Sequence, residues 1–362
     1  MPSPGQSRIE CIGNLRCLAA TLVVLYHTDL QVLRLSGGQH IHAFGFSAAG
    51  TDLLFVISGF IMVYITRSDD VRFGEFVLRR VARLAPLYWS LTFLMLAAFL
   101  AVPGLFHTTS FVTLHFLASL AFLPYPHPIL AIQRPFLFPG WALNYFMFFY
   151  LLFGLFLFLP TKRRIATVGL ILCTLTLLRL LFFGVNPVLD FYGMPIVLDF
   201  VLGMAVAWVY LERNAVGPMV IAVALAISAA IFVAGVVGGV AEHTRSLCWG
   251  LADAGLLFSC LFVERECGWW SPGLVKHLGE ASFAIYLSNL FTLAIVTKTL
   301  LVTGLFPILG LAGSQILLLA SALAAGLLVH VVVERPLQAL SLRVGGRLLQ
   351  GARRFGRSAA AR

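Results

Sequence analysis

Apolar residues occur in runs of about twenty that recur from the N-terminal region almost to the C-terminus. An α-helix of that length rises about 30 Å, which is the thickness of the hydrocarbon core of a bilayer. The runs therefore predict membrane-spanning helices joined by polar or proline-rich segments. We expect ten spans, near residues 12–33, 45–66, 84–102, 140–160, 165–184, 189–210, 217–237, 247–264, 281–303 and 308–333.

The composition points to the same class of protein. Of the 362 residues, 60 % are hydrophobic and 11 % are charged, and the mean hydropathy is +0.95. In a soluble domain about 25 % of the residues are charged. We predict an all-α, polytopic integral membrane protein, with a transmembrane domain over residues 1–340 and a basic cytoplasmic tail over residues 341–362. The six cysteines form no CxxC pair, so we expect no metal.

The net charge of +10 comes from basic residues between the predicted spans and in the tail. Basic residues concentrate on the cytoplasmic side of membrane proteins, so this charge does not indicate a nucleic-acid partner. Three basic segments, at 79–83, 162–164 and 343–362, are separated by even numbers of predicted spans. They therefore share one side of the membrane, and we expect both termini in the cytoplasm.

Two consecutive segments interrupt the pattern. Residues 111–123 are apolar but too short to span comfortably, so we expect a re-entrant or interfacial segment on the outer side. The stretch LPYPHPILAIQRPFLFPGW, residues 123–141, contains five prolines, which exclude a regular helix and predict an ordered outer loop.

Arg16 and His27 are ionisable residues inside the first predicted span. They are eleven residues apart, so they share one helix face and lie about 16 Å apart along the axis. Each has a structural explanation, because an arginine can snorkel to the interface and a histidine can pack with its hydrogen bonds satisfied. Ionisable residues within a membrane often mark a functional site, and the shared face favours that interpretation.

Asp52 begins the second predicted span from the outer side, close in depth to His27. A carboxylate beside a histidine fixes its tautomer and stabilises the imidazolium. We expect Asp52 to orient His27, and a helix N-cap is its alternative role.

Arg79, Arg80 and Arg83 form a dense basic cluster before the third predicted span. Guanidinium groups there can bind the phosphates of a cytoplasmic ligand, and positive-inside topology alone is the alternative. The partners of Arg179, Asp190 and Asp199 stay open. Glu334 and Arg335 are expected to form an ion pair at the inner surface.

Six motifs follow one another in order: I-x-x-L-R-x-x-A continuing to LVVLYH, G-x-D-L-x-F-V-I-S-G-F, R-R-x-x-R-L-x-P-x-Y-W, P-G-W-x-L-N-Y-x-M-F-F-Y, S-x-x-I-Y-L-S and E-R-P-L. Together they resemble the membrane-bound acyltransferase-3 family over residues 8–337, and its exopolysaccharide O-acetyltransferase branch in particular. Two positions depart from that pattern. Phe146 stands where the branch usually has glutamate, and Asn289 stands where histidine is common.

The resemblance implies a multi-pass protein of the bacterial inner membrane with an acyl-CoA donor, expected to be acetyl-CoA, on the cytoplasmic side. The acceptor would be a hydroxyl of a surface or exopolysaccharide sugar, or of its lipid-linked precursor. We assign catalysis to His27 as general base and to Asp52, coenzyme A binding to Arg16, Arg79, Arg80 and Arg83, and acceptor contacts to Trp141, Asn144, Tyr145, Tyr286 and Asn289.

Two other functions fit the same features. A transporter or flippase for a lipid-linked sugar also predicts ten spans and buried charges, although the sequence has no evident inverted repeat. Phe146 suggests a third interpretation, a homologue that binds acyl-CoA or glycan without turnover. Release of free coenzyme A would distinguish the enzyme from both.

Overall fold

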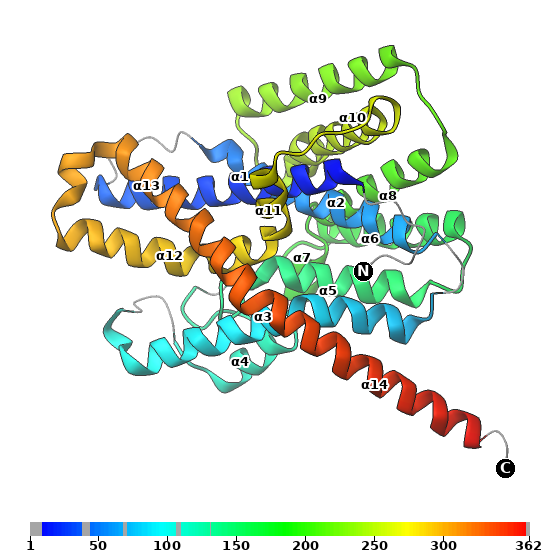
Figure 1. Cartoon of the computed structure of the whole chain (residues 1–362), viewed down its shortest axis with the longest axis horizontal. Helices are drawn as coiled ribbons and strands as arrows, with labels where there is room; N and C mark the ends of the chain where they lie inside the picture. Colours follow the sequence, from blue (N-terminus) through cyan, green and yellow to red (C-terminus); the bar gives the residue numbers. More distant parts are fainter. Residues whose placement is uncertain (1–8, 38–43, 68–70, 106–109, 131, 360–362) are drawn as a thin grey trace. The chain divides into compact units, whose positions relative to one another are not determined.

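The computed structural model describes residues 9–37, 44–67, 71–105, 110–130 and 132–359 (Figure 1). Within those ranges all regular secondary structure is helical, and an isolated bridge joins Pro126 to Gln133. Nine helical stretches of this part are long and apolar enough to cross a membrane: Glu10–Leu35, Gly45–Ile65, Phe73–Ala101, Thr161–Leu181, Pro187–Glu212, Pro218–Gly238, Glu242–Cys267, Ser282–Val302 and Leu305–Arg347. The all-α, polytopic membrane class is therefore confirmed.

The fourth expected span, residues 140–160, is shorter than predicted. It forms helix α5 (Gly140–Leu155) of 16 residues, which rises about 24 Å. The helix ends because the amides of Phe156 and Leu157 bond back to carbonyls three residues earlier, and Pro160 follows. By length alone, nine spans stand where ten were expected.

The chain folds as two compact units, and the first comprises residues 1–67 and 161–328. Its elements are α1 (Glu10–Leu35), η1 (Gly45–Ala48), α2 (Ala49–Ile65), α6 (Thr161–Leu181), α7 (Pro187–Tyr192), α8 (Val197–Glu212), α9 (Pro218–Gly238), η3 (Glu242–Thr244), the π-helix η4 (Ser246–Gly250), α10 (Leu251–Cys267), α11 (Gly273–Glu280), α12 (Ser282–Val302) and most of α13 (Leu305–Val329). Figure 1 shows α9 and α10 side by side, in agreement with their contacts.

Two glycines allow α2 and α8 to pack closely. A Cβ atom on Gly59 would overlap the backbone of Phe200, and one on Gly203 would overlap the backbone carbonyl of Val56. Small residues let membrane helices approach until their backbones touch, which increases van der Waals contact between them. The pair forms the most extensive helix contact of the described residues.

Helix α1 packs against α12 and α13 through buried apolar side chains. Ala20, Val24 and Val32 of α1 share a core cluster with residues of α12 and α13, among them Ile285 and Leu318. None of these five side chains is more than 3 % exposed. This packing fixes the rotation of α1 about its axis, and with it the direction of its polar residues.

The second unit comprises residues 68–160 and 329–362. It contains α3 (Phe73–Ala101), η2 (Pro103–Leu105), α4 (Thr113–Leu120), α5, the π-helix η5 (His330–Glu334) and α14 (Arg335–Ala359). The apolar segment 111–123 contains the short helix α4, and the described residues of the proline-rich stretch after it form no helix before Gly140. Residues 341–359 of the predicted basic tail are helical, because they belong to α14, which packs on α3 (Figure 1).

Candidate active site

His27 lies within the continuous helix α1 and is partly buried, as is Arg16 on the same face. Nδ1 of His27 lies 2.8 Å from Oδ1 of Asn289 on α12. The amide nitrogen of Asn289 donates to the backbone carbonyls of Ile285, at 3.1 Å, and Tyr286, at 2.6 Å. Asn289 is completely buried, so these bonds fix which of its atoms faces the histidine.

The orientation of Asn289 assigns the tautomer of His27. Because the amide nitrogen is engaged by two carbonyls, Oδ1 faces His27 and can only accept a hydrogen bond. Nδ1 of His27 must therefore carry the proton, and in the neutral imidazole Nε2 keeps its lone pair. Nε2 is thus the atom of His27 that can accept a proton.

The N-terminus of α1 is held by a carboxylate from α10. Glu264 accepts hydrogen bonds from the backbone amides of Glu10, at 2.7 Å, and Cys11, at 2.8 Å. No side chain of α1 caps its own first turn, so Glu264 serves as the N-cap from another helix. Gly279 of α11 meets the backbone of Gly13 with no room for a Cβ atom. These contacts set the position of the helix that carries His27.

Asp52 has a different partner from the one predicted. Both of its carboxylate oxygens bond to Arg245, at 2.6–2.9 Å, and Arg245 also donates to the carbonyl of Ala48. We predicted that Asp52 orients the imidazole of His27. The structure corrects this prediction, because Asn289 contacts that ring. Asp52 is completely buried within α2, where a carboxylate needs a cation, and Arg245 at the start of η4 supplies it.

Two further carboxylates face the Asp52–Arg245 pair. Asp199 on α8 and Asp253 on α10 lie near enough for their charges to interact with Asp52 and Arg245. Neither is more than 5 % exposed, and both oxygens of Asp199 are without a hydrogen-bond partner in the described part of the chain. Asp199 thus belongs to a buried acidic cluster, and Arg245 and Asp253 are members that the sequence analysis missed.

The arginines of α3, in the second unit, differ from one another. Arg79 pairs with Glu75 at 2.6 Å and is half exposed, and Arg83 is exposed. The guanidinium of Arg80 lies 5.7 Å from the ring of Phe76 and 6.0 Å from that of Tyr150, and its Nε is buried without a hydrogen-bond partner. Of the three arginines, Arg79 is the one whose charge a carboxylate of the described residues neutralises, so Arg80 and Arg83 keep theirs for an anionic ligand.

The N-terminal end of α5 combines an aromatic platform with a buried amide. Trp141 lies under the guanidinium of Arg134, at 5.0 Å, and 5.9 Å from the ring of Tyr145. Asn144 is 1 % exposed, and neither atom of its amide has a hydrogen-bond partner among the described residues. Phe146 packs near Tyr150, one turn along the helix. Tyr145 is completely buried, so its contact with an acceptor would require movement of its neighbours.

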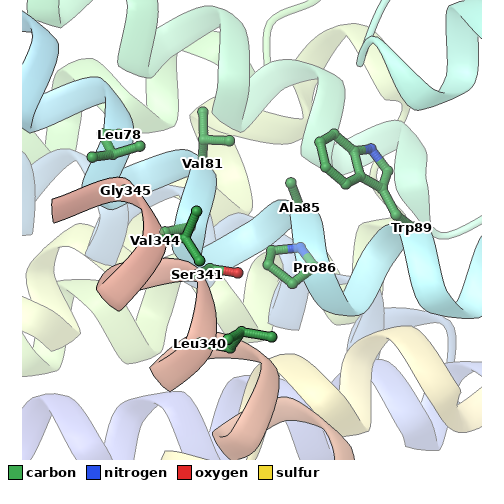
Figure 2. Close-up of a pocket in the computed structure, with 10 residues that line it drawn as sticks. Leu78, Val81, Ala85, Pro86, Trp89, Leu340, Ser341, Val344 and Gly345 are labelled. Carbon is green, nitrogen blue, oxygen red and sulfur yellow. The ribbon is translucent and has the colours of Figure 1, made fainter. Parts of the chain in front are cut away.

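A groove between α3 and α14 has a volume of about 300 Å³ (Figure 2). Figure 2 shows Trp89 and Pro86 of α3 on one side and Leu340 and Val344 of α14 on the other. Its lining is almost wholly apolar, with the hydroxyl of Ser341 as an exception, so it offers no acid–base chemistry. In the described parts of the chain, no three His, Cys, Asp or Glu side chains meet as a metal site.

The fold and the histidine site define a polytopic helical membrane protein in which a histidine on α1 is held by an asparagine on α12. The sequence model of the acyltransferase-3 family, described as an acyltransferase domain, matches residues 9–335, so the chain belongs to that family. The chain is also 34 % identical over 301 residues to the exopolysaccharide production protein ExoZ of Rhizobium meliloti (strain 1021), which is 82 % of this chain and 91 % of that protein. No solved structure matches the chain.

Proposed function

We propose that this protein is an O-acyltransferase of a bacterial inner membrane, with both termini in the cytoplasm. It transfers an acyl group, acetyl in the simplest case, from cytoplasmic acyl-CoA to a sugar hydroxyl of a surface polysaccharide, an exopolysaccharide or a lipid-linked precursor. Membership of the acyltransferase-3 family and similarity to a protein of exopolysaccharide production support the proposal. The tautomer of His27 set by Asn289 is the observation that carries it.

In this mechanism Nε2 of His27 accepts the proton of the acceptor hydroxyl while the oxygen of that hydroxyl attacks the thioester carbonyl. The carbon–sulfur bond then breaks, and the leaving thiolate takes the proton from the imidazolium. The products are the O-acylated sugar and the free thiol of coenzyme A. Base catalysis of this kind contributes about 10²–10⁴-fold.

The remaining site residues have proposed binding roles. Arg16, Arg79, Arg80 and Arg83 bind the anionic donor, and Arg80 offers a buried Nε–H that has no hydrogen-bond partner among the described residues. Asn144 binds the acceptor, because its buried amide has both a donor and an acceptor to offer. Trp141, Tyr145 and Tyr286 are further proposed acceptor contacts.

The test uses inverted membrane vesicles, whose cytoplasmic face meets the medium. Acetyl-CoA and crude glycolipid are added, and the release of free thiol is followed for the wild type and for His27→Ala. His243→Ala is the matched control, because it removes an exposed imidazole from η3 of the same unit. We expect His27→Ala to lose at least about 100-fold in rate and His243→Ala to keep the wild-type rate. A wild-type rate in His27→Ala would rule out the mechanism.

A further inference from the structure

The last apolar helix ends in a turn with an ordered set of polar side chains. In the π-helix η5, His330 Nδ1 lies 2.6 Å from Glu334 Oε2, and Nε of Arg335 donates to His330 Nε2 at 3.1 Å. Because the Nε–H of an arginine can only donate, His330 Nε2 is the acceptor and Nδ1 carries the proton given to Glu334. The expected Glu334–Arg335 ion pair is thus replaced by a hydrogen-bonded series, in which the imidazole of His330 links the carboxylate to the guanidinium.

The imidazole and the carboxylate of this hydrogen-bonded series are buried, and the guanidinium is not. His330 is 8 % and Glu334 is 4 % exposed, while Arg335 is exposed. A buried polar pair stabilises a fold no better than apolar side chains of the same size. Here its hydrogen bonds restrict one exposed guanidinium, and a restricted guanidinium loses less side-chain freedom when it binds a ligand.

The turn is attached to α3 beside Arg83. Gln338, one helical turn after Glu334, donates to the backbone carbonyl of Arg83 at 3.3 Å, and η5 contacts α3 directly. These elements belong to one compact unit. Arg335 therefore lies in the same region of that unit as the arginines of α3.

The charges of this unit favour an anion. In its described residues the carboxylate side chains are Glu75 and Glu334, and they are engaged by Arg79 and His330. The arginines of α3 together with Arg335 outnumber them. A planar guanidinium in a fixed orientation suits the bidentate binding of a phosphate group.

We propose that Arg335 binds a phosphate group of the coenzyme A donor, and that His330 and Glu334 are positioning residues for its guanidinium. This inference rests on the proposed function, because it takes the donor from it. Arg335 belongs to the same phosphate-binding set as Arg79, Arg80 and Arg83. The shared chemistry is that of a phosphate ester, which a lipid headgroup also carries.

Equilibrium binding tests the proposal on the purified full-length protein in a detergent without anionic lipid. The probes are coenzyme A, its 3′-dephospho form and pantetheine, which lacks all of the phosphates. We expect Arg335→Gln to weaken coenzyme A binding by about 10–100-fold and to leave pantetheine binding unchanged. Arg335→Lys should lose less, because it keeps the charge. Arg343→Gln, at an exposed arginine of α14, is the matched control.

Two variants separate positioning from general stability. His330→Gln keeps a donor and an acceptor at that position, and His330→Leu keeps neither. If His330 positions Arg335, the glutamine variant should retain more coenzyme A affinity than the leucine variant. The loss in the leucine variant should appear as a higher donor KM with an unchanged kcat. The thermal unfolding of each variant is measured in parallel, and Arg335→Lys tests the site if Arg335→Gln does not fold.

Three outcomes overturn the inference. Unchanged coenzyme A binding by folded Arg335→Gln would remove Arg335 from the site and leave the proposed function standing. Loss of binding to phosphatidylglycerol vesicles, with coenzyme A binding intact, would assign Arg335 to a lipid headgroup. A wild-type protein that binds no coenzyme A would contradict the donor of the proposed function as well.

Discussion

Nδ1 of His27 lies 2.8 Å from Oδ1 of Asn289, although 262 residues separate them in the sequence. An amide oxygen selects the tautomer of the imidazole as a carboxylate would, but it brings no negative charge to stabilise the imidazolium. The site therefore combines an oriented base with an uncharged support. The role of Asn289 can therefore be tested by substitution, as that of His27 can.

Replacing Asn289 by leucine should slow acyl transfer. Asn289→Leu removes the acceptor of the Nδ1 proton, so both tautomers of His27 become accessible and the ring loses its orientation. We expect the rate of thiol release to fall about 10²-fold or more, with the donor KM unchanged. Ser288→Ala is the control, because the Ser288 hydroxyl bonds to the carbonyl of Ala284 within the same helix. Full activity in Asn289→Leu would show that the tautomer does not matter.

Neutralising either Asp52 or Arg245 alone should destabilise the protein more than neutralising both side chains together. Asp52→Asn leaves a buried guanidinium without its carboxylate, and Arg245→Gln leaves the carboxylate without its cation. Removing one partner of a buried pair costs about 3–5 kcal/mol. Thermal unfolding in detergent measures the effect. If the double variant is as unstable as the sum of the single variants, the two side chains do not stabilise each other.

Replacing Glu264 by alanine should loosen the start of α1. The variant loses two hydrogen bonds from a carboxylate to backbone amides, and we expect the unfolding free energy to fall by about 2 kcal/mol. Glu212→Ala is the control, because its ion pair with Lys162 is 47 % and 65 % exposed and contributes less than about 1 kcal/mol. Hydrogen exchange of the Glu10 and Cys11 amides should also become faster. Equal stability of the two variants would contradict the interhelical cap.

The α2–α8 contact should not tolerate one added methyl group. In Gly203→Ala the new Cβ atom meets the Val56 carbonyl, whereas in Gly238→Ala it meets nothing within 4 Å. We expect the first variant to lower the thermal midpoint clearly and the second to leave it unchanged. Equal yields and equal thermal midpoints for the two alanine variants would mean that α2 and α8 can move apart with little loss of stability.

The loop after α4 should loosen in acid. Burial and the neighbouring His115 lower the pKa of His127 below its ordinary value of 6.5. Its Nδ1 accepts from the amides of Ile129 and Leu130, both at 3.3 Å, and protonation removes that acceptor. With a folded pKa below the unfolded one, this stabilisation is complete above about pH 6.5 and declines as the pH falls through that value.

Hydrogen exchange measures this pH dependence. Once corrected for intrinsic rates, exchange of the Ile129 and Leu130 amides should be faster at pH 5.5 than at pH 7.5. His127→Gln should show little change between these two conditions. An amide that exchanges equally at both pH values in the wild type would contradict the assignment.

Hydrophobic runs predicted the helices well, because the bilayer sets the length that a spanning helix needs. They predicted the ends less well. Helix α3 begins at Phe73 and not near residue 84, since its first turns are basic and do not count as apolar. The helical course of α14 was also missed, because a sequence rich in arginine was taken as a tail.

The sequence suggested candidate site residues, but it did not predict which of them pair. Residue spacing placed Arg16 and His27 on one face of a helix, which the continuous α1 allows. Asn289 was expected at the acceptor, although it contacts His27, and Arg245 was missed altogether. Spacing describes one helix at a time, whereas these pairs join helices far apart in sequence. A lone arginine at the start of an apolar run, as in EHTRSLCWG, was the available signal.

Asp52 precedes Arg245 by 193 positions in the sequence, and this separation also sets an order of events during synthesis. A ribosome adds about 5–20 residues per second, so the carboxylate emerges roughly 10–40 s before its guanidinium exists. Through that interval the nascent chain holds α2 in or beside the translocon with an acid that has no partner. An aspartate at the centre of a membrane helix costs about 3 kcal/mol during insertion. Asp52 lies in the first turn of α2, where the cost is smaller, and the apolar remainder of the helix must offset it. The ion pair therefore forms late in biogenesis, only after Arg245 has been synthesised.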